Sequence, residues 1–381
     1  MKLSSDRILT THVGSLPRPG GVSEFLLQKE NDDSYDQAGF DACMSDAVNQ
    51  VVARQVEAGI DIVSDGEMSK IGYATYIKDR YHGFSGDSPR RIPGDLKLYP
   101  NYVQKIAAQG ETPKLARPMC TGEISVKDEA ALVSDIDNLT NAVAKSGAVQ
   151  GFMNAASPGV ISVFQPNEYY ADEDQYLEAL SEAMRAEYEA INAAGLVIQL
   201  DCPDLAMGRH TMYADASDAE FIKRAEAQVE ALNHALRNIP ADMARMHLCW
   251  GNYEGPHVCD IPLEKIVHVV KKVKPQVLSF EASNPRHAHE WAVWRDAKIA
   301  DDKVLLPGVI DSVSNFVEHP DFVAERICRF ADFVGRERVL AGSDCGFATF
   351  AGFGKIDPDI CYAKLNTLAK GAEIASKRLW S

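Results

Sequence analysis

The most constraining feature of this 381-residue chain is a repeated alternation of short apolar runs with longer amphipathic stretches. Amphipathic stretches such as 174–194 and 218–237 separate the apolar runs, and the first of them ends at Gly195, a typical helix stop. Repeated alternation of strands and helices predicts a parallel sheet. The eight expected strands span residues 8–13, 60–64, 151–155, 196–200, 245–250, 277–280, 304–310 and 339–342.

Eight strand–helix units favour an α/β fold of the closed (β/α)₈ TIM barrel type over an open doubly wound sheet. An open sheet of that kind usually carries a glycine-rich phosphate turn after its first strand. The first expected strand instead runs into THVGSLPRP, which contains neither GxGxxG nor GxxxxGK[ST]. We therefore expect one barrel domain over residues 1–381. Residues 70–148, irregular and rich in Gly and Pro over 83–113, are expected to form an insertion between strands 2 and 3.

Composition and charge exclude several classes of function. Hydrophobic residues make up 46% of the chain and charged residues 25%, which is typical of a soluble protein with a sizeable core. The net charge of −16 argues against a nucleic-acid or anionic-membrane partner, because both require a basic surface. There is no apolar run long enough for a transmembrane helix, and no secretory signal at the start. We therefore expect a cytoplasmic protein whose eight cysteines are reduced.

Carboxylates and ligands for soft metals are concentrated where the expected strands end. In a (β/α)₈ barrel, the C-terminal ends of the strands carry the catalytic residues. Side chains at these ends should therefore meet at one mouth of the barrel. The residues in question are Gly14, Ser15, Asp65, Glu67, Asp201, His247, Cys249, Glu281, Asp311, Asp344 and Cys345.

His247 and Cys249 are two residues apart on an expected strand, so both side chains point to one face and could hold one metal ion. The alternative is a buried thiol that packs as a small hydrophobic residue beside a hydrogen-bonded histidine. A second pair with the same spacing, His257 and Cys259, follows in a loop. The two pairs together could form a closed His₂Cys₂ zinc site.

Glu281 and Cys345 end two other expected strands and would converge on the mouth with His247 and Cys249. Zinc accepts nitrogen, sulfur and oxygen ligands, and a mixed set with a carboxylate suits an exchangeable catalytic site. Two thiolates, a carboxylate and a neutral imidazole leave the zinc centre with a net negative charge. Such a centre activates water poorly but can bind a substrate thiol and remove its proton. We therefore predict a catalytic Zn²⁺ site formed by these four residues.

Glu67 and Asp201 have two interpretations. Either carboxylate could cap a helix, since both lie where a strand gives way to the next segment. Facing the mouth instead, the two carboxylates would hold an ammonium group. The turn at Gly14 and Ser15 could offer backbone N–H groups to a carboxylate. Together these features describe a pocket for an amino acid.

Seven segments, in this order and spacing, resemble the C-terminal catalytic barrel of the cobalamin-independent methionine synthase family. They cover essentially the whole chain, and RPMCTGEIS additionally resembles a hairpin motif of that family, which supports the expected insertion. The seven segments are THVGSLPRP, DIVSDGE, IQLDCPDLA, HLCWG, LSFEAS, LLPGVID and AGSDCG.

The resemblance implies a fold, a cofactor and a set of site residues. It implies a zinc barrel in which homocysteine receives a methyl group. The family's zinc ligands fall on His247, Cys249, Glu281 and Cys345, and its homocysteine contacts fall on Val13, Gly14, Ser15, Glu67 and Asp201.

The chain departs from the family pattern on the methyl-donor side. The family's proton-donating histidine falls on Val313, and the acidic residue that contacts folate falls on Met207. His319, six residues after Val313, could replace the proton donor. The second barrel of the family's full-length enzyme, which helps hold the folate polyglutamate, has no counterpart in these 381 residues.

We therefore expect a zinc-dependent methyl or alkyl transferase whose partners are a small thiol and an alkyl donor. Homocysteine is the expected thiol and methionine the product, while the donor need not be a folate and could be delivered by a corrinoid-carrying protein. One alternative is an enzyme similar to epoxyalkane–coenzyme M transferase, in which Arg18 or Arg286 would contact the sulfonate. An alternative of another class is a non-catalytic zinc- or thiol-binding protein. Turnover of an alkyl donor with homocysteine would distinguish the enzymes from it.

Overall fold

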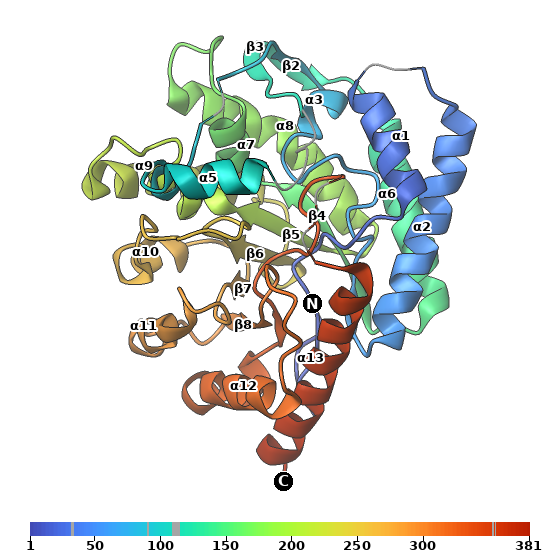
Figure 1. The fold of residues 1–381 in the computed structure, drawn as a ribbon, viewed down its shortest axis with the longest axis vertical. Helices are drawn as coiled ribbons and strands as arrows, with labels where there is room; N and C mark the ends of the chain where they lie inside the picture. The colour runs from blue at the N-terminus through green and yellow to red at the C-terminus, as the bar shows by residue number, and fades with distance from the viewer. Residues whose placement is uncertain (32–33, 90, 109–114, 353, 355) are drawn as a thin grey trace.

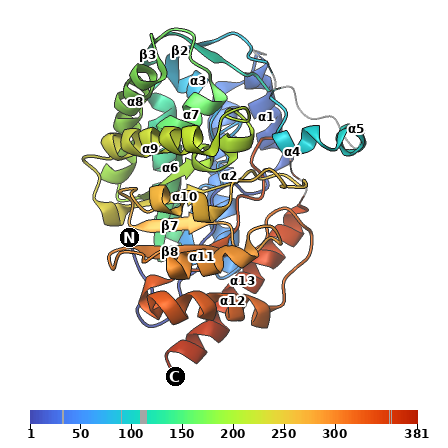
Figure 2. The same ribbon diagram turned by 90° about the vertical axis from the view of Figure 1, so that its left-hand side faces the viewer.

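Seven parallel strands form the central sheet of the protein, and helices surround it on the outside (Figures 1 and 2). The computed structural model describes residues 1–31, 34–89, 91–108, 115–352, 354 and 356–381. The order of the strands in the sheet follows the order in the chain, so each helix crosses to the next strand position. The strands, in sheet order, are β1 (Ile62–Val63), β4 (Gln150–Ala156), β5 (Val197–Cys202), β6 (Ala244–Leu248), β7 (Val277–Phe280), β8 (Val304–Ile310) and β9 (Gly342–Ser343).

The segment expected as the first strand, residues 8–13, lies between the two edges of this sheet. Thr10 forms a parallel bridge with Ala341, next to β9. The Ile62 N–H in β1 donates to the Thr10 carbonyl at 3.0 Å. The segment is not a regular strand, because the Thr10 N–H donates to the Asp61 carboxylate at 2.9 Å instead of to a neighbouring carbonyl. The α/β barrel class is thus confirmed, with the correction that its first position is an irregular bridge.

The helices begin and end at local sequence signals. Ser217 and Glu220 form a capping box at the start of α9, and Asp172 caps α8. Gly147 ends α6 in the left-handed conformation, with φ of 78°. The outer helices are α1 (Gly20–Glu30), α2 (Gln37–Glu57), α6 (Ala130–Ser146), α7 (Pro158–Phe164), α8 (Glu173–Ala193), α9 (Asp218–Ala235), α10 (Leu263–Val270), α11 (Trp291–Asp296), α12 (Pro320–Val334) and α13 (Pro358–Leu379).

A long connection between β1 and β4 carries a second, antiparallel sheet of two strands, β2 and β3, which lies apart from the barrel strands (Figure 2). This is the region expected as an insertion, and the division of the chain into one barrel domain with an insertion over 70–148 stays a prediction. Before α6, the connection contains α3 (Ile77–Arg80), β2 (Tyr81–Ser85), α4 (Gly94–Lys97), α5 (Pro100–Ala107) and β3 (Met119–Val126).

The interior of the barrel is filled, so the mouth has a closed floor. A compact cluster of buried aliphatic and aromatic side chains, including Phe152 and Leu306, comes from the strands around the ring. Above it, the buried Arg245 guanidinium lies 3.4 Å from the centre of the Phe152 ring and donates to the Thr11 hydroxyl at 3.0 Å. Polar side chains at the strand ends therefore face a mouth with a packed floor, not a pore through the barrel.

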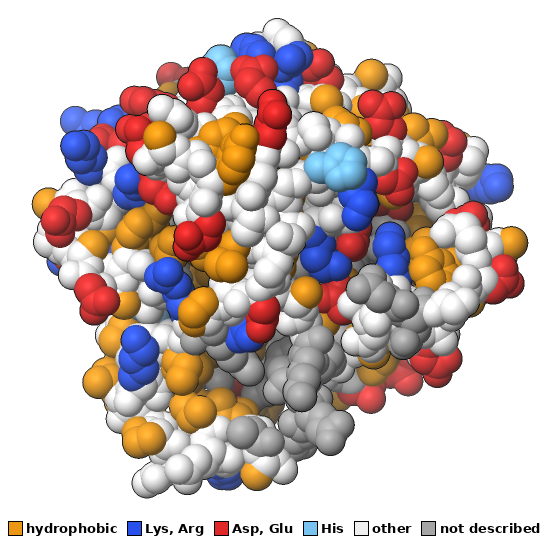
Figure 3. Space-filling view, turned by 90° about the horizontal axis from the view of Figure 1, so that it is seen from above, with side chains coloured by type: hydrophobic (Ala, Val, Ile, Leu, Met, Phe, Trp, Pro, Cys, Tyr) orange, Lys and Arg blue, Asp and Glu red, His pale blue; other side chains and the backbone are white. Residues whose placement is uncertain are grey.

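The surface seen from above the view of Figure 1 has acidic, basic and hydrophobic side chains interspersed (Figure 3). Among the helices of the described residues, none is long and apolar enough to cross a membrane.

Candidate functional site

Three of the predicted metal ligands come together where β6 and β9 end. His247 lies on β6, Cys249 follows it, and Cys345 follows β9. Their ligand atoms all lie within 4.8 Å of one another, and the two sulfur atoms are 3.7 Å apart. The exposed fractions are 2% for His247, 6% for Cys249 and 9% for Cys345. The alternation of the strand places His247 and Cys249 on one face, as the spacing predicted.

The His247 ring is in the state that a metal ligand requires. Burial lowers the pKa of His247 to about 3, so the imidazole is neutral at physiological pH. Its Nδ1 lies 3.3 Å from the Ser279 hydroxyl. Its Nε2 is buried without a hydrogen-bond partner among the described residues. A buried ring nitrogen with a free lone pair is normally satisfied, and a metal ion would satisfy it here.

The two thiols also fit a cation. The hydrogen bond between the sulfur atoms, together with burial, raises the pKa of Cys249 well above its usual range. For Cys345 that hydrogen bond lowers the pKa, but burial and the nearby Glu281 outweigh it and raise the pKa overall. Two buried thiolates side by side are unfavourable without a compensating positive charge, and a bound divalent cation reverses this balance.

Glu281, the fourth predicted ligand, follows β7 and is 7% exposed. One carboxylate oxygen accepts the Trp250 N–H at 2.8 Å, and the other accepts an N–H of the Asn284 side chain at 2.8 Å. Burial, followed by the nearby Cys249, raises the pKa of Glu281 well above its usual range. The carboxylate thus lies near Cys249 but outside the group of three, and its role as a ligand stays a prediction.

Asp344 supports the cluster from behind. It directly precedes Cys345, and its Oδ1 accepts the backbone N–H groups of Ala282 and Ser283, both at 2.8 Å. These bonds fix the loop that carries Glu281. A Cβ atom at Gly308 would lie 2.1 Å from an Asp344 oxygen, so this packing requires glycine there. Asp344 therefore positions the loop.

The alternative His₂Cys₂ site is wrong for this structure. The His257 ring is engaged at both nitrogens, with Nδ1 3.0 Å from the Asp260 carboxylate and Nε2 3.0 Å from the Tyr253 carbonyl. Neither His257 nor Cys259 belongs to the group of metal-ligating side chains found among the described residues.

The two carboxylates of the predicted amino-acid pocket are buried close together. Asp201 is the second-last residue of β5, and its oxygens accept N–H groups of Asn154 at 3.0 Å and of Gln199 at 2.9 Å. Glu67 has a φ of 57°, a strained conformation for this residue, and its Oε2 has no partner among the described residues. Burial raises the pKa of both carboxyl groups, and the Asp201 charge raises that of Glu67 further. A cation such as an ammonium group would relieve this repulsion.

Val13, Gly14 and Ser15 lie between this pair and the thiols. The Val13 carbonyl accepts an Asn154 N–H at 2.9 Å. Gly14 has a φ of 154°, and a Cβ there would lie 2.4 Å from the Asn154 side chain. On the other side, the Ser15 carbonyl accepts the Phe347 N–H at 2.8 Å, two residues after Cys345. The segment therefore connects the carboxylate end of the site to the thiol end.

Arg18 does not offer a free cation to a sulfonate. Its guanidinium donates to the backbone carbonyls of Glu67 at 2.9 Å, Lys70 at 3.0 Å and Ala348 at 2.7 Å. These bonds tie the loop after β1 to the loop after β9. Arg286, the other candidate, is an exposed residue after β7.

Tyr73 is a residue of the site that the sequence analysis missed. Its ring makes an edge contact with Phe164, with 5.5 Å between ring centres, and a tilted contact with Phe350 at 5.9 Å. Burial raises the pKa of Tyr73, and the next largest causes are Cys249, Cys345 and Asp201, which places its hydroxyl within their electrostatic range. Its position six residues after Glu67 was the only signal available.

The donor side offers no acid at the expected positions. Val313 is half-buried, and its N–H donates to Asp311 at 3.1 Å. Met207 donates its N–H to the Cys249 carbonyl at 3.2 Å. His319, the suggested substitute, caps α12 by accepting the Asp321 N–H at 3.3 Å, and its side chain is 75% exposed. His319 thus points to solvent.

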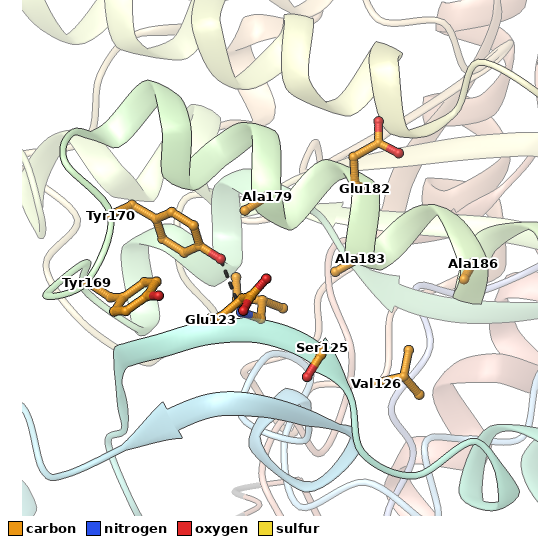
Figure 4. Close-up of a pocket in the computed structure, with 10 residues that line it drawn as sticks. Glu123, Ser125, Val126, Tyr169, Tyr170, Ala179, Glu182, Ala183 and Ala186 are labelled. Carbon is orange, nitrogen blue, oxygen red and sulfur yellow. Dashed lines mark hydrogen bonds between the residues drawn. The ribbon is translucent and has the colours of Figure 1, made fainter.

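A separate groove lies between β3 and α8 (Figure 4). The Tyr170 hydroxyl accepts the Ile124 N–H at 3.1 Å within it. The predicted site residues do not line this groove, so it is not part of the candidate site.

In sequence, the chain is similar to a protein family and to individual curated proteins. Residues 117–353 match the family described as "Cobalamin-independent synthase, Catalytic domain". A curated protein named methionine synthase from Saccharolobus solfataricus is 27% identical over 377 residues, covering 97% of this chain and 95% of that protein. Another protein of the same name, from Sulfolobus acidocaldarius, is 25% identical over 374 residues, covering 97% and 93%.

Solved structures show the same fold. A B12-independent methionine synthase from Shewanella sp. W3-18-1, in complex with selenomethionine, aligns with a TM-score of 0.74 at 18% identity, covering 98% of this chain and 99% of that one. A structure described as a putative vitamin-B12-independent methionine synthase from Listeria monocytogenes aligns with a TM-score of 0.66, also at 18% identity, covering 97% and 98%.

Proposed function

The chain belongs to the family of cobalamin-independent methionine synthase catalytic domains, and we propose that it transfers a methyl or other small alkyl group to the thiol of homocysteine, with Zn²⁺ as its cofactor. The observation that carries the proposal is the convergence of the His247, Cys249 and Cys345 ligand atoms within 4.8 Å. The buried, unpartnered Nε2 of His247 supports it, because that atom requires a partner.

His247, Cys249, Cys345 and Glu281 would hold the ion. When bound, zinc lowers the pKa of a coordinated substrate thiol while leaving its sulfur nucleophilic. Burial around the cluster excludes water from this position.

Glu67 and Asp201 would hold the ammonium group of the amino acid. Their repulsion in the buried pair is relieved by a cation, and the unpartnered Glu67 oxygen is available to accept its hydrogen bond. The Val13–Ser15 turn, which lies between these carboxylates and the thiols, would contact the substrate carboxylate. Fixing the amino acid at both ends orients its sulfur for in-line attack on the methyl carbon, as the bond to the leaving group of the donor breaks.

The donor side favours a methyl donor that needs no general acid. A methylated folate requires protonation of its leaving nitrogen. Val313 has no acidic proton to donate, and His319 faces solvent. A sulfonium compound or a methylated corrinoid has a better leaving group, and a corrinoid-carrying protein would be the partner in the second case. The engagement of Arg18 with three carbonyls argues against the sulfonate–thiol alternative.

A donor screen tests the proposal. Zinc-loaded protein is incubated with homocysteine and either methyl-tetrahydrofolate, a methyl sulfonium, a methylcorrinoid or an epoxide, and the product is identified by mass. Methionine formation with at least one methyl donor is expected. Homocysteine binding should also release close to one proton per chain near neutral pH, since a free thiol has a pKa of about 8.5. Binding without turnover of any donor would favour the non-catalytic alternative, and binding without proton release would contradict thiol coordination.

A further inference from the structure

A buried cluster of histidines and acids adjoins the predicted zinc site without belonging to it. We call it the Asp260 cluster: Asp260, His210, His257, His287 and Glu290. One Asp260 oxygen lies 3.0 Å from His257 Nδ1 and 3.0 Å from His287 Nε2, and the other lies 3.5 Å from His210 Nε2. The other His287 nitrogen lies 2.9 Å from Glu290. His287 is 3% exposed and Asp260 7%, so the network is shielded from water.

The cluster joins several loops at the mouth. His257 and Asp260 belong to the loop after β6, His287 lies in the loop after β7, and His210 ends the 3₁₀ helix η2 (Met207–His210). Asp95 in α4 adds a further tie, because its carboxylate accepts the His257 backbone N–H at 2.8 Å. The loops joined in this way include those that carry Cys249 and Glu281.

The cluster reaches the predicted ligands through Trp250. The His287 and Trp250 rings are stacked, with centres 4.2 Å apart and an angle of 28° between their planes. The Trp250 N–H donates to a Glu281 oxygen at 2.8 Å, and the next N–H, of Gly251, donates to the Cys249 sulfur at 3.3 Å. The backbone that His287 holds in place thus presents consecutive N–H groups to two predicted zinc ligands.

The charge of His287 also favours the predicted zinc site. Burial lowers its pKa, but the hydrogen bonds with Asp260 and Glu290 outweigh burial and raise the pKa to about 10. The imidazole is therefore a cation at neutral pH. A zinc centre with two thiolates and a carboxylate has excess negative charge, which a nearby cation offsets.

We propose that His287, fixed by Asp260 and Glu290, is a positioning residue that holds Glu281 and the Trp250–Gly251 backbone in place for zinc binding. This inference rests on the proposed function, because it assumes that Glu281 is a zinc ligand. Groups that orient metal ligands typically contribute about 10–100-fold to metal affinity.

The test measures zinc affinity, not activity. Purified His287→Gln and Asp260→Asn proteins are compared with the unchanged protein by competition with a chelator of known affinity, and the ligand atoms are counted by zinc X-ray absorption. We expect about 10–100-fold weaker binding and loss of the oxygen ligand in both variants. His289→Gln is the matched control, since His289 is exposed and only two residues away, and it should bind zinc as the unchanged protein does.

Unchanged affinity and an unchanged oxygen ligand in a folded His287→Gln protein would overturn the inference. If that variant does not fold, Glu290→Gln removes one of the two acids that hold His287 and should still weaken zinc binding several-fold. If the unchanged protein binds no zinc, the proposed function fails and this inference fails with it. If it binds zinc through sulfur and nitrogen alone, only the inference fails.

Discussion

On the side of the mouth formed by β6, β7 and the loop after β9, polar side chains are buried and held by specific partners. Glu281 accepts two hydrogen bonds, and the sulfur atoms of Cys249 and Cys345 are 3.7 Å apart. On the side formed by the loops after β5 and β8, the corresponding positions carry Met207 and Val313, and His319 is 75% exposed. The two sides thus differ in whether the positions implied by the family resemblance carry polar groups.

This difference separates two requirements of thiol alkylation. Buried polar groups are unfavourable unless they are paired. The buried polar side chains on the thiol side therefore indicate a function there. The thiol side must create a nucleophile from a protonated sulfur. The donor side needs an acid only if the leaving group is poor. A site equipped on one side alone suits a donor that already has a good leaving group.

Removing a thiol ligand should have the largest effect on zinc binding and turnover, and it tests the thiol side directly. Cys345→Ser replaces a soft ligand by a hydroxyl that remains protonated, so zinc should be lost and turnover should fall by about 10⁴-fold or more. Thermal denaturation should change little, because strand-end residues at a barrel mouth contribute less to the core than to function. Cys328→Ser, a half-buried position on α12, is the control and should keep both zinc and turnover. Retention of zinc in Cys345→Ser would contradict the thiol side as described.

The donor side predicts a strong preference among methyl donors. With homocysteine as acceptor, a methyl sulfonium or a methylcorrinoid should exceed methyl-tetrahydrofolate in kcat/KM by about 10²–10⁴-fold, the usual contribution of a general acid. Introducing the missing acid as Val313→His should raise turnover of methyl-tetrahydrofolate selectively. Equal turnover of all donors in the unchanged protein would show that the two sides do not differ as proposed.

Much of the fold and part of the site could be predicted from the sequence. β7 and β8 have the predicted bounds because continuous apolar runs mark strands buried on both faces. β1 and β9 contain two residues each. Residues 8–13 form only a bridge, because the Asp61 carboxylate takes the Thr10 N–H that a strand would use. Such competition depends on tertiary contacts that a linear pattern does not contain.

The site shows the same limit. The spacing predicted that His247 and Cys249 share one face, and the structure brings their ligand atoms together with that of Cys345. Tyr73 was missed because it lies in an irregular loop, where no periodicity indicates its direction. The second His–Cys pair stayed an open alternative, because spacing alone could not show that Asp260 and Tyr253 engage both nitrogens of the His257 ring.

The carboxylate pair predicts a pH dependence of amino-acid binding. Burial and Asp201 raise the pKa of Glu67, so at mildly acid pH it is protonated and cannot pair with an ammonium group. Affinity for methionine, measured by calorimetry, should therefore increase as the pH rises from about 6 to 8, as Glu67 ionises. Glu67→Gln should remove most of this dependence and weaken binding at pH 8 by about 10–100-fold, the value of a buried hydrogen bond to a charged group.

The pH dependence of folding stability should have the opposite sign to that of binding. A carboxyl group whose pKa is higher in the folded than in the unfolded state destabilises the fold as the pH rises above its ordinary range. Glu67→Gln should therefore unfold at a higher temperature than the unchanged protein at pH 8, with the difference disappearing at acid pH. Glu123→Gln, at the groove between β3 and α8, is a control that should change neither property. A pH-independent affinity in the unchanged protein would contradict the role of Glu67.

Tyr73 provides the smallest expected effect and the sharpest test, because its substitution can assign it to one side or the other. Tyr73→Phe keeps the ring contacts with Phe164 and Phe350 and removes only the hydroxyl, which has no hydrogen-bond partner among the described residues. Folding should therefore be unaffected. Since Cys249, Cys345 and Asp201 dominate its electrostatic surroundings, we place the hydroxyl on the thiol side. Loss of one donor to a charged group should then lower kcat/KM about tenfold, by the same factor for good and poor methyl donors. Tyr169→Phe, an exposed tyrosine on the other groove, is the control. A loss that grows as the leaving group becomes poorer would instead assign Tyr73 to the donor side, where it would be the acid that Val313 is not.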